Sequence, residues 1–272
     1  MTKTFGTLLN LVREGKPLVH HITNYVTVTD CANITLGIGA SPVMADAMEE
    51  AAAIAAIAGA VVINIGTLNE RTIPSMIAAG KSANAEGVPV VFDPVGAGAS
   101  KLRNSTAERL INEVKLSVIR GNISEIRSVA GLGSKTKGVD ASESDLTGAD
   151  DAGQIAKSLA HKLGCVVVIS GAVDTISDGN KIMYLENGHP MLGNLTGTGC
   201  MCSSLIGSFC GAAKDEPFAA AVAAMLCMGV AGELAFENAG RLGNGSFHVA
   251  LHDAISLMNA EKLETLARYR EA

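Results

Sequence analysis

The stretch Ala60-Val61-Val62-Ile63-Asn64-Ile65-Gly66 decides the fold class, because it is a nearly continuous apolar run that ends near a polar residue and a glycine. Similar runs follow at residues 88–94, 116–122 and 165–171. Such short runs, rich in β-branched residues, are typical of strands buried on both faces of a sheet. The segments between the runs that we expect to be helical are residues 70–86, 104–113, 123–130 and 150–163. This alternation predicts an α/β fold with a mainly parallel central sheet and helices on both faces.

The pattern changes after the last of these strands. Residues 173–176 and 181–185 are expected to form a hairpin, whose turn contains the favourable pair Asp178-Gly179. Three further helices are predicted at residues 200–213, 216–236 and 247–260. Residues 261–272 are expected to be a surface helix or a frayed end. No linker composition or charge block divides the chain, so residues 1–272 are expected to form a single domain.

The composition limits the possible partners. Of the 272 residues, 48% are hydrophobic and 18% are charged, as in globular proteins. Aromatic residues make up 3% of the chain and Trp is absent, which argues against the stacking platforms that bind single-stranded nucleic acid. The formal net charge of −6 offers no basic surface for a polyanion, so nucleic acid is not expected as a partner.

The sequence predicts neither export nor a membrane span. Residues 1–5 show no apolar signal region, and the long uncharged runs at 51–69 and 195–213 are interrupted by glycines and polar residues. The six cysteines lack metal-type Cys-x-x-Cys spacing and lie mostly in apolar surroundings, as expected in a reducing compartment. We therefore expect a cytoplasmic protein in which only Cys200, beside a glycine turn, is placed for chemistry.

The segment Asn194-Leu195-Thr196-Gly197-Thr198-Gly199-Cys200 leads directly into a predicted helix. The glycines leave backbone N–H groups free to face one point, with the positive end of the helix dipole behind them. Gly197, Thr198 and Gly199 are therefore candidates for an anion hole that meets a phosphoryl group during transfer. The alternative is a glycine-rich turn that only starts a core helix.

Polar residues gather where the predicted strands end, which is where open parallel sheets bind ligands. They are Asn64, Asp93, Arg120, Asn122 and Ser170. Asp93 is a candidate to hold a magnesium-bound water, or else to accept N–H groups of the loop that follows it. Arg120 can offer a bidentate positive charge to phosphate oxygens.

The segment Asn122-Ile123-Ser124-Glu125 allows two interpretations. Asn122 is suited to a helix N-cap and Glu125 stands three residues later, as in a capping box. Glu125 is equally able to project from the first helical turn toward metal-bound water and phosphate. The neighbouring glycine turn favours this second interpretation.

The histidines are weaker candidates. His20 and His21 follow Pro17-Leu18-Val19, and one of them is able to line a pocket. His248 and His252 stand one helical turn apart, as metal ligands would, but without a Glu-bearing zinc motif. We interpret this second pair as surface or core residues.

These motifs together resemble a known family. The Asn122-x-x-Glu125 pair, the glycine turn and the α/β order resemble the ribokinase-like small-molecule kinases, most of which carry Asp where this chain has Cys200. The cysteine and several longer motifs closely resemble the hydroxyethylthiazole kinases. Those motifs are His21-Ile22-Thr23-Asn24, Gly39-Ala40-Ser41-Pro42-Val43-Met44, Asp93-Pro94-Val95-Gly96-Ala97-Gly98 and Ile119-Arg120-Gly121-Asn122. The likeness extends over nearly the whole chain, from Pro17 to Phe247.

The resemblance implies ATP-dependent phosphorylation of the primary hydroxyl of 4-methyl-5-(2-hydroxyethyl)thiazole, in thiamine biosynthesis and salvage. It also implies a homotrimer with sites at subunit interfaces, which Asn24 and Arg120 would then serve from different subunits. The residues that it places at the thiazole are Asn24, Val26, Met44 and Gly197. Those expected at ATP are Arg120, Asn122 and Ser170. Asp93 and Glu125 would organise Mg2+, and Cys200 would face the accepting hydroxyl.

The chemistry of these residues suits such a reaction. Val26 and Met44 can enclose a small apolar ring to which Asn24 donates a hydrogen bond. Cys200 is a poor base because a free thiol titrates at about pH 8.5, although a helix N-terminus can lower that value. We expect Cys200 to position the hydroxyl first and to accept its proton second. Two alternatives stay open: a hydroxymethylpyrimidine-type kinase, and an ATP-dependent dehydratase that repairs hydrated nicotinamide cofactors.

Overall fold

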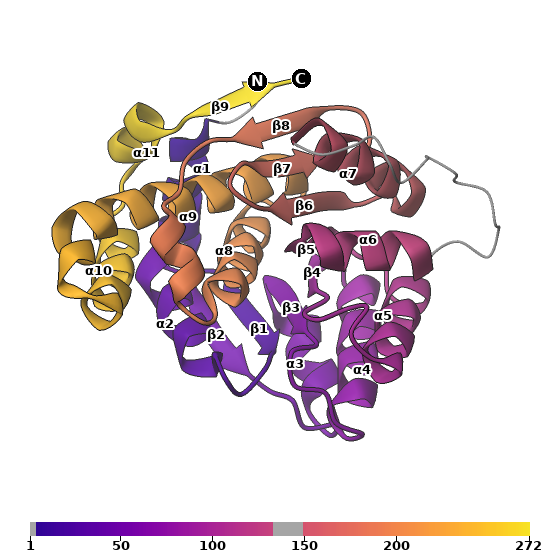
Figure 1. The fold of residues 1–272 in the computed structure, drawn as a ribbon. Coiled ribbons are helices and arrows are strands. Elements are labelled where there is room, and N and C mark those ends of the chain that lie inside the picture. Colours follow the sequence, from indigo (N-terminus) through magenta and orange to yellow (C-terminus); the bar gives the residue numbers. More distant parts are fainter. Residues whose placement is uncertain (1–3, 133–148) are drawn as a thin grey trace.

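A nine-stranded sheet runs through the computed structural model, which describes residues 4–132 and 149–272 (Figure 1). In spatial order the strands are β2 (Ser41–Met44), β1 (Leu18–Ile22), β3 (Ala60–Asn64), β4 (Val90–Asp93), β5 (Val118–Asn122), β6 (Val166–Ser170), β7 (Asp174–Ser177), β8 (Ile182–Leu185) and β9 (Tyr269–Glu271). Neighbours from β2 to β6 pair in parallel, and neighbours from β6 to β9 pair antiparallel. The four predicted apolar strands form its centre, β3 to β6, which confirms the mainly parallel α/β fold.

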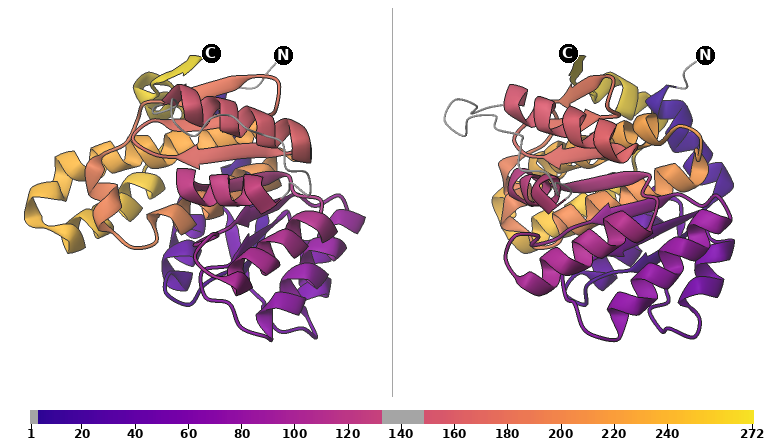
Figure 2. Two further views of the ribbon diagram at one scale, coloured as in Figure 1. Left: turned by 45° about the vertical axis from the view of Figure 1, so that its right-hand side comes forward. Right: turned by 90° about the vertical axis from the view of Figure 1, so that its right-hand side faces the viewer.

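Helices cover both faces of this sheet, as the views in Figure 2 show. One face carries α3 (Ala51–Ile57), α4 (Thr72–Ala85), α5 (Lys101–Glu113), α6 (Ile123–Leu132) and α7 (Ala149–Leu163). The other face carries α8 (Thr198–Ala212) and α9 (Pro217–Ala239), with α1 (Phe5–Gly15), α2 (Val28–Ile38), α10 (Asn244–Ser256) and α11 (Ala260–Leu266) packed around them. The described residues also contain two short 3-10 helices, η1 (Pro190–Asn194) and η2 (Gly240–Leu242). Each face thus encloses its own apolar core.

The helices α8 and α9 consist of small and apolar residues because both lie in the interior. Gly207 lets α8 approach the sheet closely, since a Cβ there would stand 2.5 Å from Cγ2 of Val62. The helical stretch Pro217–Leu242 is long and apolar enough to cross a membrane, yet 78% of its most apolar window is buried inside the fold. Burial within one core accounts for this hydrophobicity, so α9 is a core helix.

The apolar runs made no prediction for residues 5–57, which form α1, β1, α2, β2 and α3. The tail contains the helix α11, but the residues after it do not fray, because residues 269–271 pair with β8 as β9. The hairpin formed by β7 and β8 is confirmed. Residues 1–3 and 133–148 lie outside the described residues, so a single domain over residues 1–272 and the absence of an N-terminal signal stay predictions.

The register of the sheet brings the polar strand ends together. Asn64 pairs with Asp93 across β3 and β4, and Asn122 pairs with Ser170 across β5 and β6. Because parallel strands end at the same edge, these residues share the edge at which α8 begins.

Candidate active site

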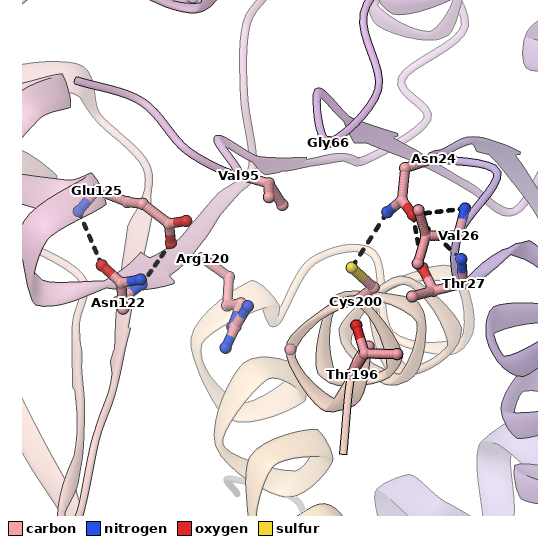
Figure 3. A pocket seen from close by; sticks show the side chains of 12 residues that line it. Asn24, Val26, Thr27, Gly66, Val95, Arg120, Asn122, Glu125, Thr196 and Cys200 are labelled. Atoms are coloured by element: carbon pink, nitrogen blue, oxygen red, sulfur yellow. Dashed lines mark hydrogen bonds between the residues drawn. The ribbon is translucent and has the colours of Figure 1, made fainter. Parts of the chain in front are cut away.

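A cavity of about 350 Å³ opens at this edge of the sheet (Figure 3). Such a volume is within the range of small-molecule sites. The residues that line it are Asn24, Val26, Thr27, Gly66, Val95, Arg120, Asn122, Glu125, Thr196, Gly197, Gly199 and Cys200. Figure 3 shows Glu125 and Asn122 at one end, Cys200 with Asn24 and Thr27 at the other, and Arg120 between them. One cavity of one chain thus brings most of the predicted site residues together.

Two asparagine side chains hold the thiol of Cys200. Nδ2 of Asn24 and Nδ2 of Asn64 each donate to its Sγ over 3.3 Å. Asn24 also donates to Oδ1 of Asn64 over 3.1 Å. Its own Oδ1 accepts from the backbone N–H of Val26 and Thr27 and so fixes the entry into α2. Cys200 is therefore held by side chains from two other segments of the fold.

The thiol of Cys200 is neutral in this environment. Burial raises its pKa, and the nearby carboxylate of Asp93 raises it further, against smaller opposing effects of hydrogen bonds from Thr27, Asn24 and Asn64. The lowering that a helix N-terminus can produce is therefore not the net result here. Removal from water outweighs the helix terminus here.

The glycine turn is shaped by its contact with α2 and with Arg120. Gly197 has φ +88°, and a Cβ there would stand 2.5 Å from Cγ2 of Thr27. A Cβ on Gly199 would stand 2.5 Å from Nη1 of Arg120. Thr198 starts α8 and donates its hydroxyl to the carbonyl of Leu192, so this side chain is bound outside the cavity. Only glycine fits at either side of this turn without displacing a neighbour.

Asp93 lies behind the cavity and is completely buried. Its Oδ2 accepts from Nδ2 of Asn64 over 2.9 Å and from Oγ of Ser203 over 2.8 Å. Its Oδ1 has no hydrogen-bond partner among the described residues and is 3.8 Å from Nη1 of Arg120. Burial raises the pKa of this carboxyl, and Arg120 and the hydrogen bonds from Ser203 and Asn64 oppose that rise.

Arg120 connects this buried carboxylate to the cavity. It is the third residue of β5 and is only 8% exposed, yet it lines the cavity. Its Nη2 donates to Oγ of Ser170 over 2.6 Å. Ser170 therefore orients the guanidinium from the next strand, outside the lining itself. Arg120 and Asn24 line the same cavity of the same chain, so the expectation that different subunits supply them to one site is wrong.

Asn122 and Glu125 form the capping arrangement that their spacing allows. The N–H of Asn122 donates to Oε2 of Glu125 over 2.8 Å, and the N–H of Glu125 donates to Oδ1 of Asn122 over 2.9 Å. The other oxygen, Oε1, accepts from the N–H of Gly96 over 2.9 Å. Glu125 therefore caps α6, fixes the loop after β4 and still faces the cavity.

Three other candidates, on β1 and β2, do not line the cavity. Met44 is the last residue of β2 and pairs with His21 in β1. His21 is buried beneath α8, where its Nε2 is 3.2 Å from Oγ of Ser204, and burial lowers its pKa to about 4. His20 binds the carbonyl of Ala45 through Nε2. Both histidines are thus structural contacts of β1, and neither is among the lining residues.

The sequence did not indicate the role of Arg103. This residue of α5 donates through Nη1 to the carbonyls of Ile65 and Val95 and through Nη2 to that of Gly66. It thereby joins the two loops that carry the lining residues Gly66 and Val95. The sequence also did not identify Thr27 and Thr196 as residues that line the cavity. For Thr27 one signal was available, because it stands three residues after Asn24, within reach of an Asx turn.

Comparison with known proteins agrees with this geometry. The chain matches the Hydroxyethylthiazole kinase family over residues 9–261. It belongs to the hydroxyethylthiazole kinase family. A hydroxyethylthiazole kinase from Clostridium beijerinckii is 61% identical over 267 residues, which cover 98% of this chain and 96% of the relative. One from Ruminiclostridium cellulolyticum is 57% identical over 270 residues, which cover 99% of this chain and 98% of the relative.

Solved structures agree with the family and its fold. The hydroxyethylthiazole kinase protein from Pyrococcus horikoshii OT3 superposes with a TM-score of 0.89 at 39% identity and covers 98% of each chain. Pyridoxal kinase from Staphylococcus aureus superposes with a TM-score of 0.61 at 17% identity, over 80% of this chain and 88% of that one. The second likeness concerns the fold alone, and it agrees with the predicted single α/β architecture.

Proposed function

We propose that this chain transfers the terminal phosphoryl group of ATP to the primary hydroxyl of 4-methyl-5-(2-hydroxyethyl)thiazole, in thiamine biosynthesis and salvage. Family membership supports the reaction class, since the relatives are hydroxyethylthiazole kinases by name. The observation that carries the proposal is the position of Cys200. Its sulfur lies beside the glycine turn in a cavity that also contains Arg120 and Glu125.

The Cys200 end of the cavity is assigned to the acceptor. Asn24, Val26 and Gly197 line this part of the wall and would contact a small heterocycle, with Met44 at the end of the neighbouring strand. The neutral thiol of Cys200 would orient the hydroxyl rather than carry a charge. Phosphoryl transfer makes small demands on a base, so orientation and charge stabilisation supply most of the acceleration.

The other end is assigned to the phosphates. The guanidinium of Arg120, held by Ser170, would bind phosphate oxygens, and Asn122 at the start of α6 would lie beside the nucleotide. The N–H groups of residues 197–199 at the start of α8 would stabilise the charge of the phosphoryl group in transfer. The two ends meet at Arg120, so the acceptor and the phosphates would approach each other there.

Asp93 and Glu125 fit a Mg2+ ion by donor type, because Mg2+ takes one or two carboxylates and keeps several waters. Oδ1 of Asp93 has no hydrogen-bond partner among the described side chains and backbone groups. Both oxygens of Glu125 already accept backbone N–H groups, so Glu125 would hold the ion through water. Bound Mg2+ would neutralise charge on the phosphates.

A homotrimer with sites at subunit interfaces explains an otherwise exposed pocket wall. Val26 is 58% exposed and Tyr25 is 79% exposed, although Val26 is expected to enclose an apolar ring. Leu36 on α2 and Val249 on α10 are also exposed. Exposed large apolar side chains that gather on one surface are typical of an interface. Sedimentation should show a trimer, and a monomer that is fully active at nanomolar concentration would contradict it.

The cytoplasm is the proposed compartment. All six cysteines are free, and five of them are buried. Unpaired thiols are usual where the environment is reducing.

One assay tests the proposed reaction. The protein is incubated with ATP and Mg2+ and with either hydroxyethylthiazole or hydroxymethylpyrimidine, and the phosphorylated product is measured. We expect phosphorylation of the thiazole alcohol. Preference for the pyrimidine would point to the related kinase activity. Phosphate release without a phosphorylated acceptor, in the presence of a hydrated nicotinamide cofactor, would point to the dehydratase.

A further inference from the structure

Two histidines and one aspartate form a cluster beside the cavity. Asp30 lies in the first turn of α2, and His248 and His252 lie one turn apart on α10. Oδ1 of Asp30 is 3.0 Å from Nε2 of His248 and 3.7 Å from Nε2 of His252. The three donor atoms lie within 4.8 Å of one another. Sequence spacing alone suggested surface or core histidines, because Asp30 is remote from them in the chain.

The hydrogen bonding of this cluster is incomplete. Nε2 of His248 is buried and has no hydrogen-bond partner among the residues that the structure describes, although Asp30 is within ion-pair distance. A buried polar atom without a partner costs free energy. The two imidazole rings lie 5.1 Å apart at an interplanar angle of 61°, so they do not stack face to face. An ion between the three donors would satisfy the unpartnered nitrogen.

The two separations that involve Asp30 suit a tetrahedral metal ion. Donors that are each about 2.0–2.1 Å from Zn2+ in tetrahedral geometry stand about 3.3 Å from one another. The two separations from Asp30, 3.0 Å and 3.7 Å, bracket that value. Imidazole and carboxylate together suit Zn2+ and its neighbours in the transition series, whereas Mg2+ prefers oxygen donors alone. The donor set therefore separates this cluster from the Mg2+ site proposed at Asp93 and Glu125.

We propose that Asp30, His248 and His252 bind one Zn2+-type transition-metal ion, with the fourth position open to water. The ion joins the first turn of α2 to α10, two helices that pack directly against each other. It also lies next to the acceptor end of the cavity, because a Cβ on Gly197 would stand 3.8 Å from Oδ2 of Asp30. Metal binding thus fixes the helix start that follows Asn24 and Thr27.

The test uses the full-length protein after removal of metals with a chelator. Co2+ is added while its visible absorption is followed, and Zn2+ binding is measured by calorimetry. We expect one ion per chain and the intense visible bands of tetrahedral Co2+. His252→Ala and Asp30→Asn should each weaken binding at least about 100-fold. His161→Ala, at an exposed histidine of α7, is the matched control and should bind like the wild type.

Fold, thermal stability and competition by Mg2+ are measured as well. Circular dichroism of the metal-free variants verifies their fold, and Zn2+ should raise the Tm of the wild type but not that of His252→Ala. Saturating Mg2+ should not displace Zn2+. The proposal is overturned by binding only at millimolar concentrations, by unchanged affinity in the two ligand variants, or by displacement with Mg2+. A thiolate-to-cobalt charge-transfer band would also overturn it, because a cysteine would then be a ligand.

Discussion

The two ends of the cavity are built from different kinds of contact. At the Cys200 end, side-chain hydrogen bonds join residues 40, 136 and 176 positions apart in the chain. At the Glu125 end, one carboxylate binds the N–H of Asn122 three residues before it and that of Gly96 twenty-nine residues before it. One end therefore depends on the assembled tertiary structure, and the other largely on the start of a single helix.

This difference has a chemical consequence. The contacts at Cys200 join neutral groups, since the thiol is protonated and its partners are amides. The contacts at the other end involve the carboxylate of Glu125, which interacts electrostatically with the guanidinium of Arg120. The loss of one neutral hydrogen bond that orients a reactant costs about 1 kcal/mol. The loss of a charged group that stabilises the transition state raises the activation free energy by more than that. Substitutions at the charged end should therefore have the larger effect on turnover.

The largest effect is expected from Glu125→Gln. Glutamine keeps an acceptor for one of the two backbone N–H groups but removes the negative charge. We expect turnover to fall on the order of 10²-fold or more, with a changed dependence on Mg2+ concentration. The measurement is steady-state kinetics on the thiazole alcohol at several Mg2+ concentrations.

Two variants separate charge from helix capping. Asn122→Ala removes the side-chain oxygen that accepts the N–H of Glu125 but keeps the backbone N–H that donates to the carboxylate, and it should cost about 1 kcal/mol of stability. Glu113→Gln removes a carboxylate that pairs with Lys81 and Arg109 outside the cavity and should leave turnover unchanged. Near-normal turnover and Mg2+ dependence in Glu125→Gln would reduce Glu125 to a capping residue.

The next effect is expected from Gly197→Ala. The added Cβ would meet Cγ2 of Thr27 at 2.5 Å and would occupy a backbone conformation with φ +88°. A shift of the turn by about 1 Å can cost about 100-fold in rate, so we expect a loss of kcat/KM of that size. Gly193→Ala is the matched control, because no atom lies within 4 Å of its Cβ position. Equal activities of the two variants would show that the turn is not part of the site.

A smaller effect is expected from Asn64→Ala. This change removes the two hydrogen bonds that Asn64 donates to Cys200 and Asp93 and the two that it accepts from Asn24 and Gly66. The bonds to Cys200 and Asp93 are each worth about 1 kcal/mol, so kcat/KM for the thiazole should fall about tenfold or more. The KM for ATP should stay unchanged. Asn84→Ala is the control, because the Asn84 side chain also both donates and accepts hydrogen bonds, but with the backbone of Lys115 far from the cavity. A rise in the KM for ATP alone would contradict the assignment of Asn64 to the acceptor end of the cavity.

The same contrast explains what the sequence could predict. The central strands were predictable because each is a short apolar run buried on both faces, and Asn122 with Glu125 was predictable because capping is local. The contact of Asn64 with Cys200 was not, because it depends on how α8 packs against β3. The sequence showed that Asn64 is a polar residue at the end of a strand, where ligands bind, but it did not show that Cys200 is its hydrogen-bond partner.

The raised pKa of Cys200 was unpredictable for a related physical reason. The sequence shows that a helix starts at this cysteine, which would lower its pKa. It does not show how much water the packing of Asn24, Asn64 and Asp93 excludes from the sulfur. Burial is the larger effect, and it appears only in the folded chain.

The central claim is that Cys200 orients the accepting hydroxyl as a neutral thiol. Its direct test is the turnover of the wild type, Cys200→Ala and Cys200→Asp on the thiazole alcohol between pH 6 and pH 9. Below its pKa, a thiol that had to act as a thiolate base would give a rate that rises about tenfold per pH unit. Because burial raises the pKa of Cys200, such a rise would span the whole range.

We predict that the wild-type rate does not rise tenfold per pH unit through titration of the Cys200 thiol. Cys200→Ala should be slower but active, with a pH profile of the same shape as that of the wild type. Cys200→Asp should keep or exceed wild-type turnover, because the amides of Asn24 and Asn64 can donate to a carboxylate as they do to the sulfur. A tenfold rise per pH unit in the wild type that is lost in Cys200→Ala would contradict the account, as would a folded but inactive Cys200→Asp or a trapped phosphocysteine.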